Sequence, residues 1–182
     1  LDFARGAGTL ARRSFSGALL LADLARGLEK ELPGLVVVAD VRLSADARVD
    51  VDADKLRRAV GNIAANARDA MGGRGRLHLR ATLAPGEAGA LDHLVIELED
   101  EGPGVPADIR EKVFEPFVTR GKKGGTGLGL AVSKRFVEEH GGTVELLPDG
   151  PGARFRLTLP VRGPGGALES GAGRVASREH HP

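Results

Sequence analysis

The spacing of hydrophobic residues along the chain predicts helices and strands in a grouped order. Apolar residues three or four positions apart predict helices over residues 17–31, 52–71 and 128–140. Alternating or β-branched runs predict strands over residues 35–41, 47–51, 76–82, 94–99, 143–147 and 154–159. We expect the first two strands to pair with each other. Because strands and helices do not strictly alternate, the order favours an α+β fold, a two-layer α/β sandwich with helices on one face of a mixed, mostly antiparallel sheet.

The same pattern divides the chain into three regions. Residues 15–161 carry all of the periodic structure and form the expected domain. Residues 1–14 are typical of the tail of a helix that began upstream, and the chain begins with Leu1 rather than Met, so we expect a fragment of a longer protein. Residues 162–182 are rich in Gly, Ala and Ser and predict a flexible tail.

Composition narrows the possible classes of function. The absence of cysteine excludes a disulfide scaffold and a cysteine-based zinc site, and it fits a reducing compartment. The formal net charge is only +1 and the charges are interspersed, so composition gives no reason to expect nucleic acid as a partner. No apolar run approaches membrane-spanning length, and we therefore expect no direct contact with a membrane.

The most informative segment runs from Val113 to Leu130, because it combines a basic loop with alternating glycines that open a helix. Gly125, Gly127 and Gly129 would let backbone N–H groups approach an anion, and the positive end of the following helix points to the same place. The segment therefore predicts a polyphosphate site. The spacing of these glycines matches neither of the two commonest phosphate-binding loops, G-x-x-x-x-G-K-[ST] and G-x-G-x-x-G.

The helix expected over residues 52–71 carries two asparagines beside its apolar stripe. Asn62 and Asn66 are four residues apart and so share one face of the helix. Asparagine is a poor residue in the middle of a helix, and an amide oxygen can ligate a Mg²⁺ that already carries phosphate oxygens and water. A solvated helix face is the alternative interpretation of the same spacing.

Two loops complete the candidate chemistry. Asp100 ends an alternating strand, where a buried carboxylate could accept a hydrogen bond from an exocyclic amine, although the sequence DEGPG is also typical of a tight turn. Arg120, Lys122 and Lys123 lie on a glycine-flanked loop that would suit a lid over a γ-phosphate. Ordinary solvated lysines are the alternative there.

The order and spacing of these elements resemble the ATP-binding catalytic domain of bacterial sensor histidine kinases, within the superfamily shared with gyrase, Hsp90 and MutL. The resemblance covers about residues 15–161 and implies the Bergerat-type sandwich. Residues 66–71 (NARDAM) are similar to the sequence that kinases of the nitrogen-regulatory type and their hybrid relatives carry at this place. The motifs that carry the resemblance are an N box at 62–67, a G1 box at 100–104, an F box at 114–117 and a G2 box at 125–130.

The resemblance implies ATP and Mg²⁺ as ligands and assigns a role to each matching residue. Asn66 would ligate Mg²⁺, and Asn62 and Arg120 would complete the catalytic centre at the triphosphate. Asp100 would accept a hydrogen bond from the adenine 6-amino group, and Phe117 would hinge the lid. The other nucleotide-binding positions would be Gly102, Gly104, Lys122, Gly125, Thr126, Gly127, Leu128 and Gly129.

The resemblance also implies a protein histidine kinase reaction. Asn62 stands where ATPases and serine kinases of the superfamily usually carry a glutamate, and asparagine cannot accept a proton from a water or hydroxyl. Transfer to an imidazole needs no such base. The acceptor would be a histidine on a separate dimerisation domain, since no histidine here has the acceptor motif, and we expect His140 to be structural. A response-regulator receiver domain would act downstream, and this domain would be cytoplasmic whether or not its parent protein is anchored in a membrane.

Three alternatives stay open at this point. A stand-alone ATPase or clamp of the gyrase or Hsp90 kind would show steady-state hydrolysis that depends on one carboxylate. An anti-sigma-type serine kinase would leave phosphoserine on a partner protein. A non-enzymatic nucleotide-sensing module would bind ATP without transferring phosphate to any added acceptor domain.

Overall fold

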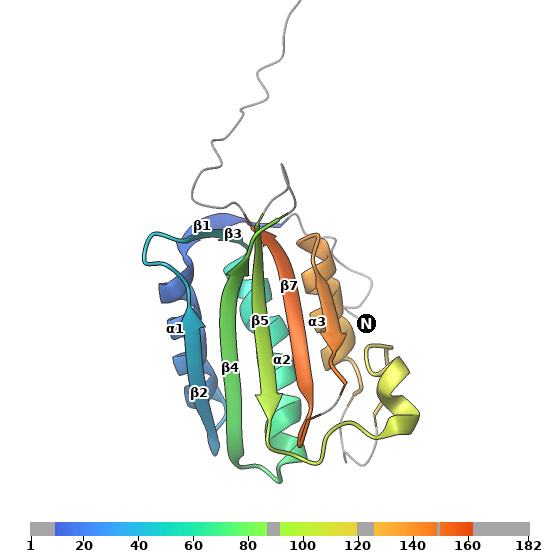
Figure 1. Cartoon of the computed structure of the whole chain (residues 1–182). Coiled ribbons are helices and arrows are strands. Elements are labelled where there is room, and N and C mark those ends of the chain that lie inside the picture. The colour runs from blue at the N-terminus through green and yellow to red at the C-terminus, as the bar shows by residue number, and fades with distance from the viewer. Residues whose placement is uncertain (1–9, 87–91, 120–125, 149, 162–182) are drawn as a thin grey trace, which may run out of the picture.

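The computed structural model describes residues 10–86, 92–119, 126–148 and 150–161, and these form a sheet backed by helices (Figure 1). The sheet has the order β2-β4-β5-β7-β6. β2 lies parallel to β4, and the other neighbouring strands are antiparallel. The bounds of its strands are β2 (Leu35–Arg42), β4 (Gly75–Ala84), β5 (Asp92–Asp100), β6 (Thr143–Leu146) and β7 (Arg154–Val161).

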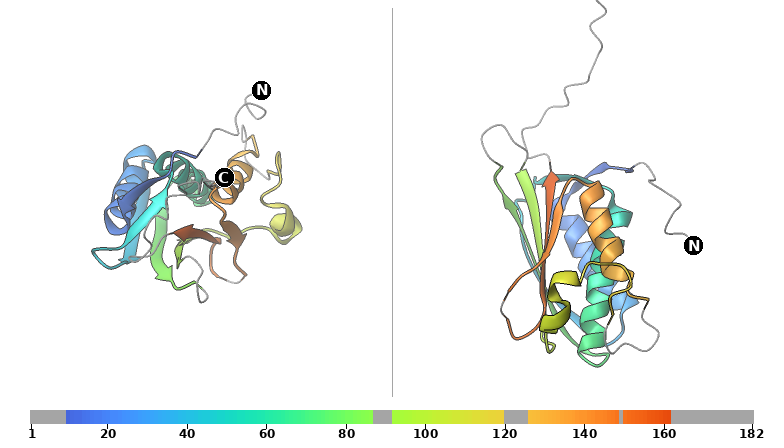
Figure 2. Two further views of the ribbon diagram at one scale, coloured as in Figure 1. Left: turned by 90° about the horizontal axis from the view of Figure 1, so that it is seen from above. Right: turned by 90° about the vertical axis from the view of Figure 1, so that its right-hand side faces the viewer.

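Helices lie on one face of this sheet, as the right-hand view of Figure 2 shows. A short 3₁₀ helix, η2 (Ala107–Lys112), follows β5 and begins next to Pro106. The two-layer α+β fold predicted from the sequence is therefore confirmed. The covering helices are α1 (Gly17–Glu31), α2 (Ala53–Ala70) and α3 (Gly129–Glu139).

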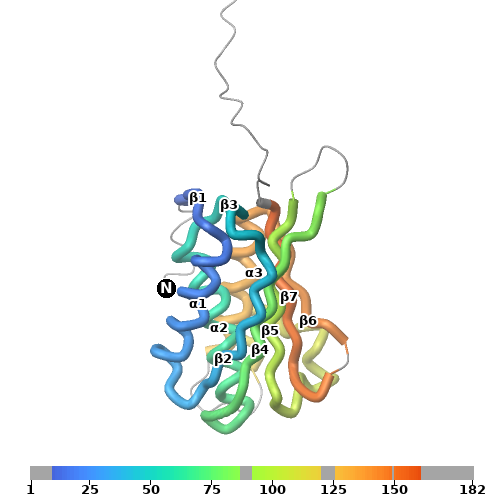
Figure 3. The backbone as a smooth tube through the Cα atoms, turned by 60° about the vertical axis from the view of Figure 1, so that its left-hand side comes forward, coloured from blue at the N-terminus to red at the C-terminus, as the bar shows by residue number. Residues whose placement is uncertain are grey.

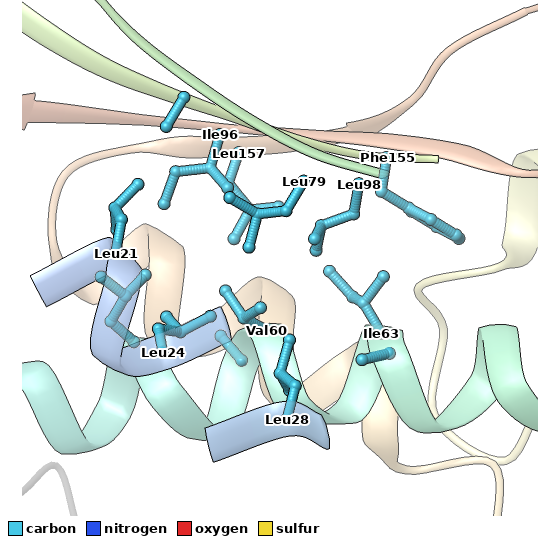
Figure 4. Close-up of a cluster of buried hydrophobic side chains, with 14 of the residues drawn as sticks. Leu21, Leu24, Leu28, Val60, Ile63, Leu79, Ile96, Leu98, Phe155 and Leu157 are labelled. Carbon is cyan, nitrogen blue, oxygen red and sulfur yellow. The ribbon is translucent and has the colours of Figure 1, made fainter. Parts of the chain in front are cut away.

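The core fills the space between the two layers, and aliphatic side chains dominate it (Figure 4). β5 shows how the pattern works, since its alternate residues Leu94, Ile96 and Leu98 are fully buried against the helices. The next position in this alternation is Asp100, which is only 3% exposed. A carboxylate thus occupies a place where the strand pattern would put a core residue. The labelled core side chains in Figure 4 are Leu21, Leu24, Leu28, Val60, Ile63, Leu79, Ile96, Leu98, Phe155 and Leu157.

Two expectations about the N-terminal part were wrong. β3 (Arg48–Val51) does not pair with β2 but lies antiparallel to β1 (Arg13–Ser16), at one end of the molecule (Figure 3). The helix tail expected over residues 1–14 is wrong for Arg13 and Ser14, because these residues belong to β1. Residues 1–9 lie outside the described part of the chain. The pairing with β1 sets Phe15 opposite the fully buried Val49, whereas β2 finds its partner in β4.

Capping residues mark the start of α2 and the ends of α2 and α3. The Asp52 side chain accepts a hydrogen bond from the Lys55 amide and so caps α2. Gly72 and Gly73, both with positive φ, terminate α2, and Gly141 (φ 77°) follows the end of α3. In the part of the chain that the structure describes, no helix has the length and apolar character needed to span a bilayer.

Candidate functional site

A cavity of about 660 Å³ opens between α2, the segment that follows β5 and the start of α3. Its polar wall includes Asn66 and Asp69 from α2 and Asp100 from the end of β5. Its apolar wall includes Val105, Ile109, Val113, Leu130 and Phe155. This combination of a broad apolar surface with a few fixed polar groups is typical of a small-molecule site.

Asp100 provides the buried charge of the cavity. Its Oδ1 accepts hydrogen bonds from the amides of Gly102 (2.8 Å) and Ala153 (3.1 Å). Burial raises the pKa of the Asp100 carboxyl, the negative charge of Glu99 adds to this effect, and the two amide hydrogen bonds only partly offset it. Both hydrogen bonds fall on one oxygen, so the second oxygen keeps its capacity to accept from a ligand.

Asn66 lies half-buried on the cavity wall, one turn after Asn62 on α2. Its amide oxygen is a suitable ligand for a Mg²⁺ whose other positions are filled by phosphate oxygens and water. Among the described residues no group of three or more His, Asp or Glu side chains could hold a metal ion by itself.

Asn62 faces a different neighbour from Asn66. Its Nδ2 donates to the Gly129 carbonyl (3.0 Å), at the first residue of α3. The fully buried Ser133 hydroxyl lies within hydrogen-bond distance of the same carbonyl (3.0 Å) and of the Ala59 carbonyl (2.9 Å). Asn62 is not among the described residues that line the cavity, and its observed contact fixes the start of α3 against α2.

The backbone joins Phe117 to the glycine turn. Phe117 has a positive φ of 66°, its side chain is exposed, and its N–H donates to the Gly127 carbonyl (2.9 Å). Gly127 itself has φ 67°, and a Cβ there would lie 2.6 Å from the Phe117 carbonyl carbon. Only glycine fits this turn. The two ends of the predicted lid therefore lie together.

The remaining predicted residues divide into two groups. Gly104 lines the cavity with φ 76°, the Thr126 hydroxyl accepts a hydrogen bond from the Leu128 amide (3.4 Å), and Leu128 precedes α3. Arg120, Lys122 and Gly125 lie outside the described residues. The structure thus brings Asn66, Asp100 and Gly104 together around the cavity, with the turn at residues 126–129 held nearby through Asn62.

Sequence reasoning missed the contribution of the turn before β7. Gly152 approaches the backbone of Asp100, and Ala153 both donates to the Asp100 carboxylate and accepts from the Asp100 amide. The sequence predicted the strands on either side of this turn, over residues 143–147 and 154–159, but no contact with Asp100. No local signal could have linked the turn to Asp100, because the two segments are neighbours only through the pairing of β5 with β7.

His140 is structural, as expected. It is 3% exposed, its Nε2 accepts from the Asp52 amide (3.0 Å), and its Nδ1 lies 2.6 Å from the Phe136 carbonyl, to which it donates. The Asp52 Oδ2 in turn accepts from the Ala11 amide (3.0 Å). This cluster joins the start of α2, the end of α3 and the segment before β1.

With this geometry established, comparison with known proteins assigns the family. The sequence model described as "Histidine kinase-, DNA gyrase B-, and HSP90-like ATPase" matches residues 51–163. The chain belongs to this family. The match includes α2, the Asp100 loop, α3 and β7, which are the elements that build the cavity.

Similar curated proteins are sensor histidine kinases. The chain is 40% identical over 118 residues to the sensory histidine kinase/phosphatase NtrB of Rhodobacter capsulatus, which covers 60% of this chain and 33% of that protein. It is 32% identical over 174 residues to the sensor histidine kinase TmoS of Ectopseudomonas mendocina, covering 89% of this chain and 17% of that protein. The chain therefore spans a third or less of these relatives.

Solved structures agree with this assignment. A mycobacterial sensor histidine kinase, MprB, is 26% identical with a TM-score of 0.65, covering 83% of this chain and 99% of that one. Full-length ShkA in complex with AMPPNP is 28% identical with a TM-score of 0.69, covering 87% of this chain and 33% of that one. The resemblance to histidine kinase catalytic domains inferred from the motifs is confirmed.

Proposed function

We propose that this domain binds Mg-ATP and donates the γ-phosphate to a histidine on a separate dimerisation domain of a sensor kinase. The observation that carries the proposal is Asp100, a buried carboxylate at the cavity with one oxygen committed to backbone amides. An acceptor of this kind selects a ligand that offers an N–H donor in an apolar slot, as the adenine 6-amino group does. Family membership supports the same ligand.

The triphosphate would extend from this slot toward Asn66 and the start of α3. The amide oxygen of Asn66 would hold Mg²⁺ together with phosphate oxygens, and that ion would neutralise charge on the phosphates. The N-terminus of α3, kept in place by Asn62 and Ser133, would direct backbone N–H groups toward the anion. We assign Arg120, Lys122 and Gly125 to the lid over the γ-phosphate as part of the proposal.

The residue at position 62 supports transfer to an imidazole rather than hydrolysis. Phosphoryl transfer depends mainly on positioning and charge stabilisation, and an imidazole acceptor brings its own nucleophilic nitrogen. Asn62 cannot serve as a base and instead donates a hydrogen bond to the Gly129 carbonyl. The acceptor domain and the response regulator that would receive the phosphoryl group belong to the proposal, since the similar kinases are at least three times longer than the matched region.

The test is a calorimetric titration of the domain with AMPPNP, with and without Mg²⁺, for wild type and Asp100→Asn. The variant can keep its amide oxygen on the two backbone N–H groups, so it places an NH₂ where the free carboxylate oxygen was. Two donors would then face each other, and we expect affinity to fall roughly 100-fold. Glu101→Gln is the matched control, because the Glu101 carboxylate contacts His78 and not the cavity.

Phosphoryl transfer is tested separately, with radiolabelled ATP and an added dimerisation domain from a similar kinase. Acid-labile, base-stable label on that domain is the expected result. Absence of binding by the wild-type domain would contradict the nucleotide assignment, and binding without transfer to any acceptor domain would contradict the kinase assignment.

A further inference from the structure

The turn between β6 and β7 passes very close to Asp100. A Cβ on Gly152 would lie 1.8 Å from the Asp100 carbonyl oxygen and 2.6 Å from Asp100 Oδ1. Those distances leave no room for any side chain. Gly152 is therefore required by the contact with Asp100 and not by its own φ, which lies outside the left-handed region.

The next residue completes the contact with two reciprocal hydrogen bonds. The Asp100 amide donates to the Ala153 carbonyl (3.0 Å), and the Ala153 amide donates to Asp100 Oδ1 (3.1 Å). The first of these hydrogen bonds joins the end of β5 to the residue before β7. The pairing of the two strands therefore keeps the Ala153 amide next to the Asp100 carboxylate.

The Gly102 amide (2.8 Å) and the Ala153 amide (3.1 Å) approach the same carboxylate oxygen from segments about fifty residues apart. A carboxylate held by a single N–H could rotate about its Cβ–Cγ bond and exchange its two oxygens. Two donors from different segments fix Oδ1 and so determine the direction in which Oδ2 can accept. That direction decides which donor on a ligand can be recognised.

From these contacts we infer that Gly152 and the Ala153 amide form a specificity-determining element that orients the Asp100 carboxylate toward the exocyclic amine of the base. The inference rests on the proposed function, since it deepens the account of the same cavity. Gly152 is a positioning residue: it acts through Asp100 and is not among the described residues that line the cavity. A methyl group at position 152 would push the turn away, remove the Ala153 hydrogen bond and free the carboxylate to rotate.

The first experiment compares Gly152→Ala with Gly150→Ala. Gly150 lies in the same turn, but a Cβ there would meet only ordinary contacts, the nearest at 3.6 Å. Affinities are measured by calorimetry for AMPPNP and for the triphosphate of purine riboside, which lacks the 6-amino group. We expect Gly152→Ala to reduce the preference for the adenine nucleotide at least tenfold and Gly150→Ala to leave it unchanged. Equal weakening toward both nucleotides would overturn the inference, because a general loss of structure would not distinguish the bases.

A second readout needs no nucleotide and so separates this inference from the proposed function. The Ala153 hydrogen bond lowers the pKa of Asp100, and its loss in Gly152→Ala should therefore raise that pKa further. Carbon-13 NMR of the side-chain carboxyl measures the change, and an unchanged titration would contradict the inference. If wild type binds no nucleotide while this shift is present, the proposed function fails and the positioning role stands.

A third measurement covers the case in which Gly152→Ala does not fold. In the wild-type domain the amide proton resonances of Gly102 and Ala153 should both follow the titration of Asp100, because both amides donate to its Oδ1. In Asp100→Asn neither resonance should show that titration. An Ala153 resonance that does not follow the carboxyl in wild type would overturn the inference without any glycine variant.

Discussion

Among the residues that the structure describes, two aspartates are buried, Asp52 and Asp100, and their surroundings shift their pKa values in opposite directions. They are 8% and 3% exposed. Burial acts to raise the pKa of both carboxyls. At Asp52 the hydrogen bonds from the Lys55 and Ala11 amides, with the positive charge of Lys55, outweigh burial and the pKa is lowered. At Asp100 burial prevails and the pKa is raised.

The difference lies in how completely each carboxylate is satisfied. Both oxygens of Asp52 accept backbone N–H groups, Oδ1 from Lys55 and Oδ2 from Ala11. The two backbone amides at Asp100 both use Oδ1. A buried carboxylate whose two oxygens both accept hydrogen bonds stabilises the fold. A carboxylate with one free oxygen can accept a hydrogen bond from a ligand, at some cost in stability. The number of carboxylate oxygens that accept a backbone hydrogen bond, rather than burial, thus distinguishes the structural aspartate from the candidate ligand-binding one.

The largest expected effect is at His140, which completes the Asp52 cluster. His140→Ala removes a buried ring and leaves the Asp52 amide and the Phe136 carbonyl without their partner. We expect a loss of about 3 kcal/mol in the free energy of unfolding, measured by urea denaturation at pH 7. His93→Ala, on the outer face of β5, is the control and should change stability by less than about 0.5 kcal/mol. A loss at His140 no larger than the control would refute the structural role.

Asp52→Ala should have the next largest effect. It removes the cap of α2 and the acceptor for the Ala11 amide, and we expect a loss of about 2 kcal/mol in the same assay. Asp54→Ala, two residues further on in the first turn of α2 and exposed, is the matched control, with a change below about 0.5 kcal/mol. If both variants lose the same stability, the cluster is not the reason for it.

Asp100→Asn should change stability in the opposite direction. Because ionising Asp100 is unfavourable in the folded state, a neutral amide at this position should raise the free energy of unfolding slightly, by up to about 1 kcal/mol at pH 7. The same urea assay measures it beside Asp52→Asn, which should destabilise. A clear destabilisation by Asp100→Asn would remove the contrast between the two sites.

The smallest effects concern pH, and their signs follow from the two pKa directions. The lowered pKa of Asp52 means that its stabilisation is present above the ordinary value of 3.8 and is lost as pH falls through the lowered pKa. The raised pKa of Asp100 means that its cost is present above the raised value and disappears as pH falls toward 3.8. Urea titrations from pH 7 to 3 should therefore show that the stability difference between wild type and each asparagine variant becomes smaller in acid. The difference for Asp52→Asn begins as a loss of stability at pH 7, and the difference for Asp100→Asn begins as a gain.

The sequence predicted the local elements well because their causes are local. Apolar spacing, the Asp52 cap and the glycines after α2 and α3 act within one or two turns, and apart from β1 the helices and strands lie where the apolar spacing predicted them. The pairing of β3 with β1 was missed, since pairing depends on which distant strand offers a matching buried face. The motifs identified Asn66, Asp100 and Gly104, and the cavity brings these three together.

The sequence by itself determined the α+β class, the motifs and therefore the family of this protein. The tertiary structure decided which residues hold those motifs in working positions. Asn62 fixes α3, Gly152 and Ala153 hold the carboxylate of Asp100, and His140 joins both helices to the segment before β1. The physical reason is that a hydrogen bond between residues fifty or more positions apart leaves no trace in local spacing, and it exists only after the sheet and the helices have packed.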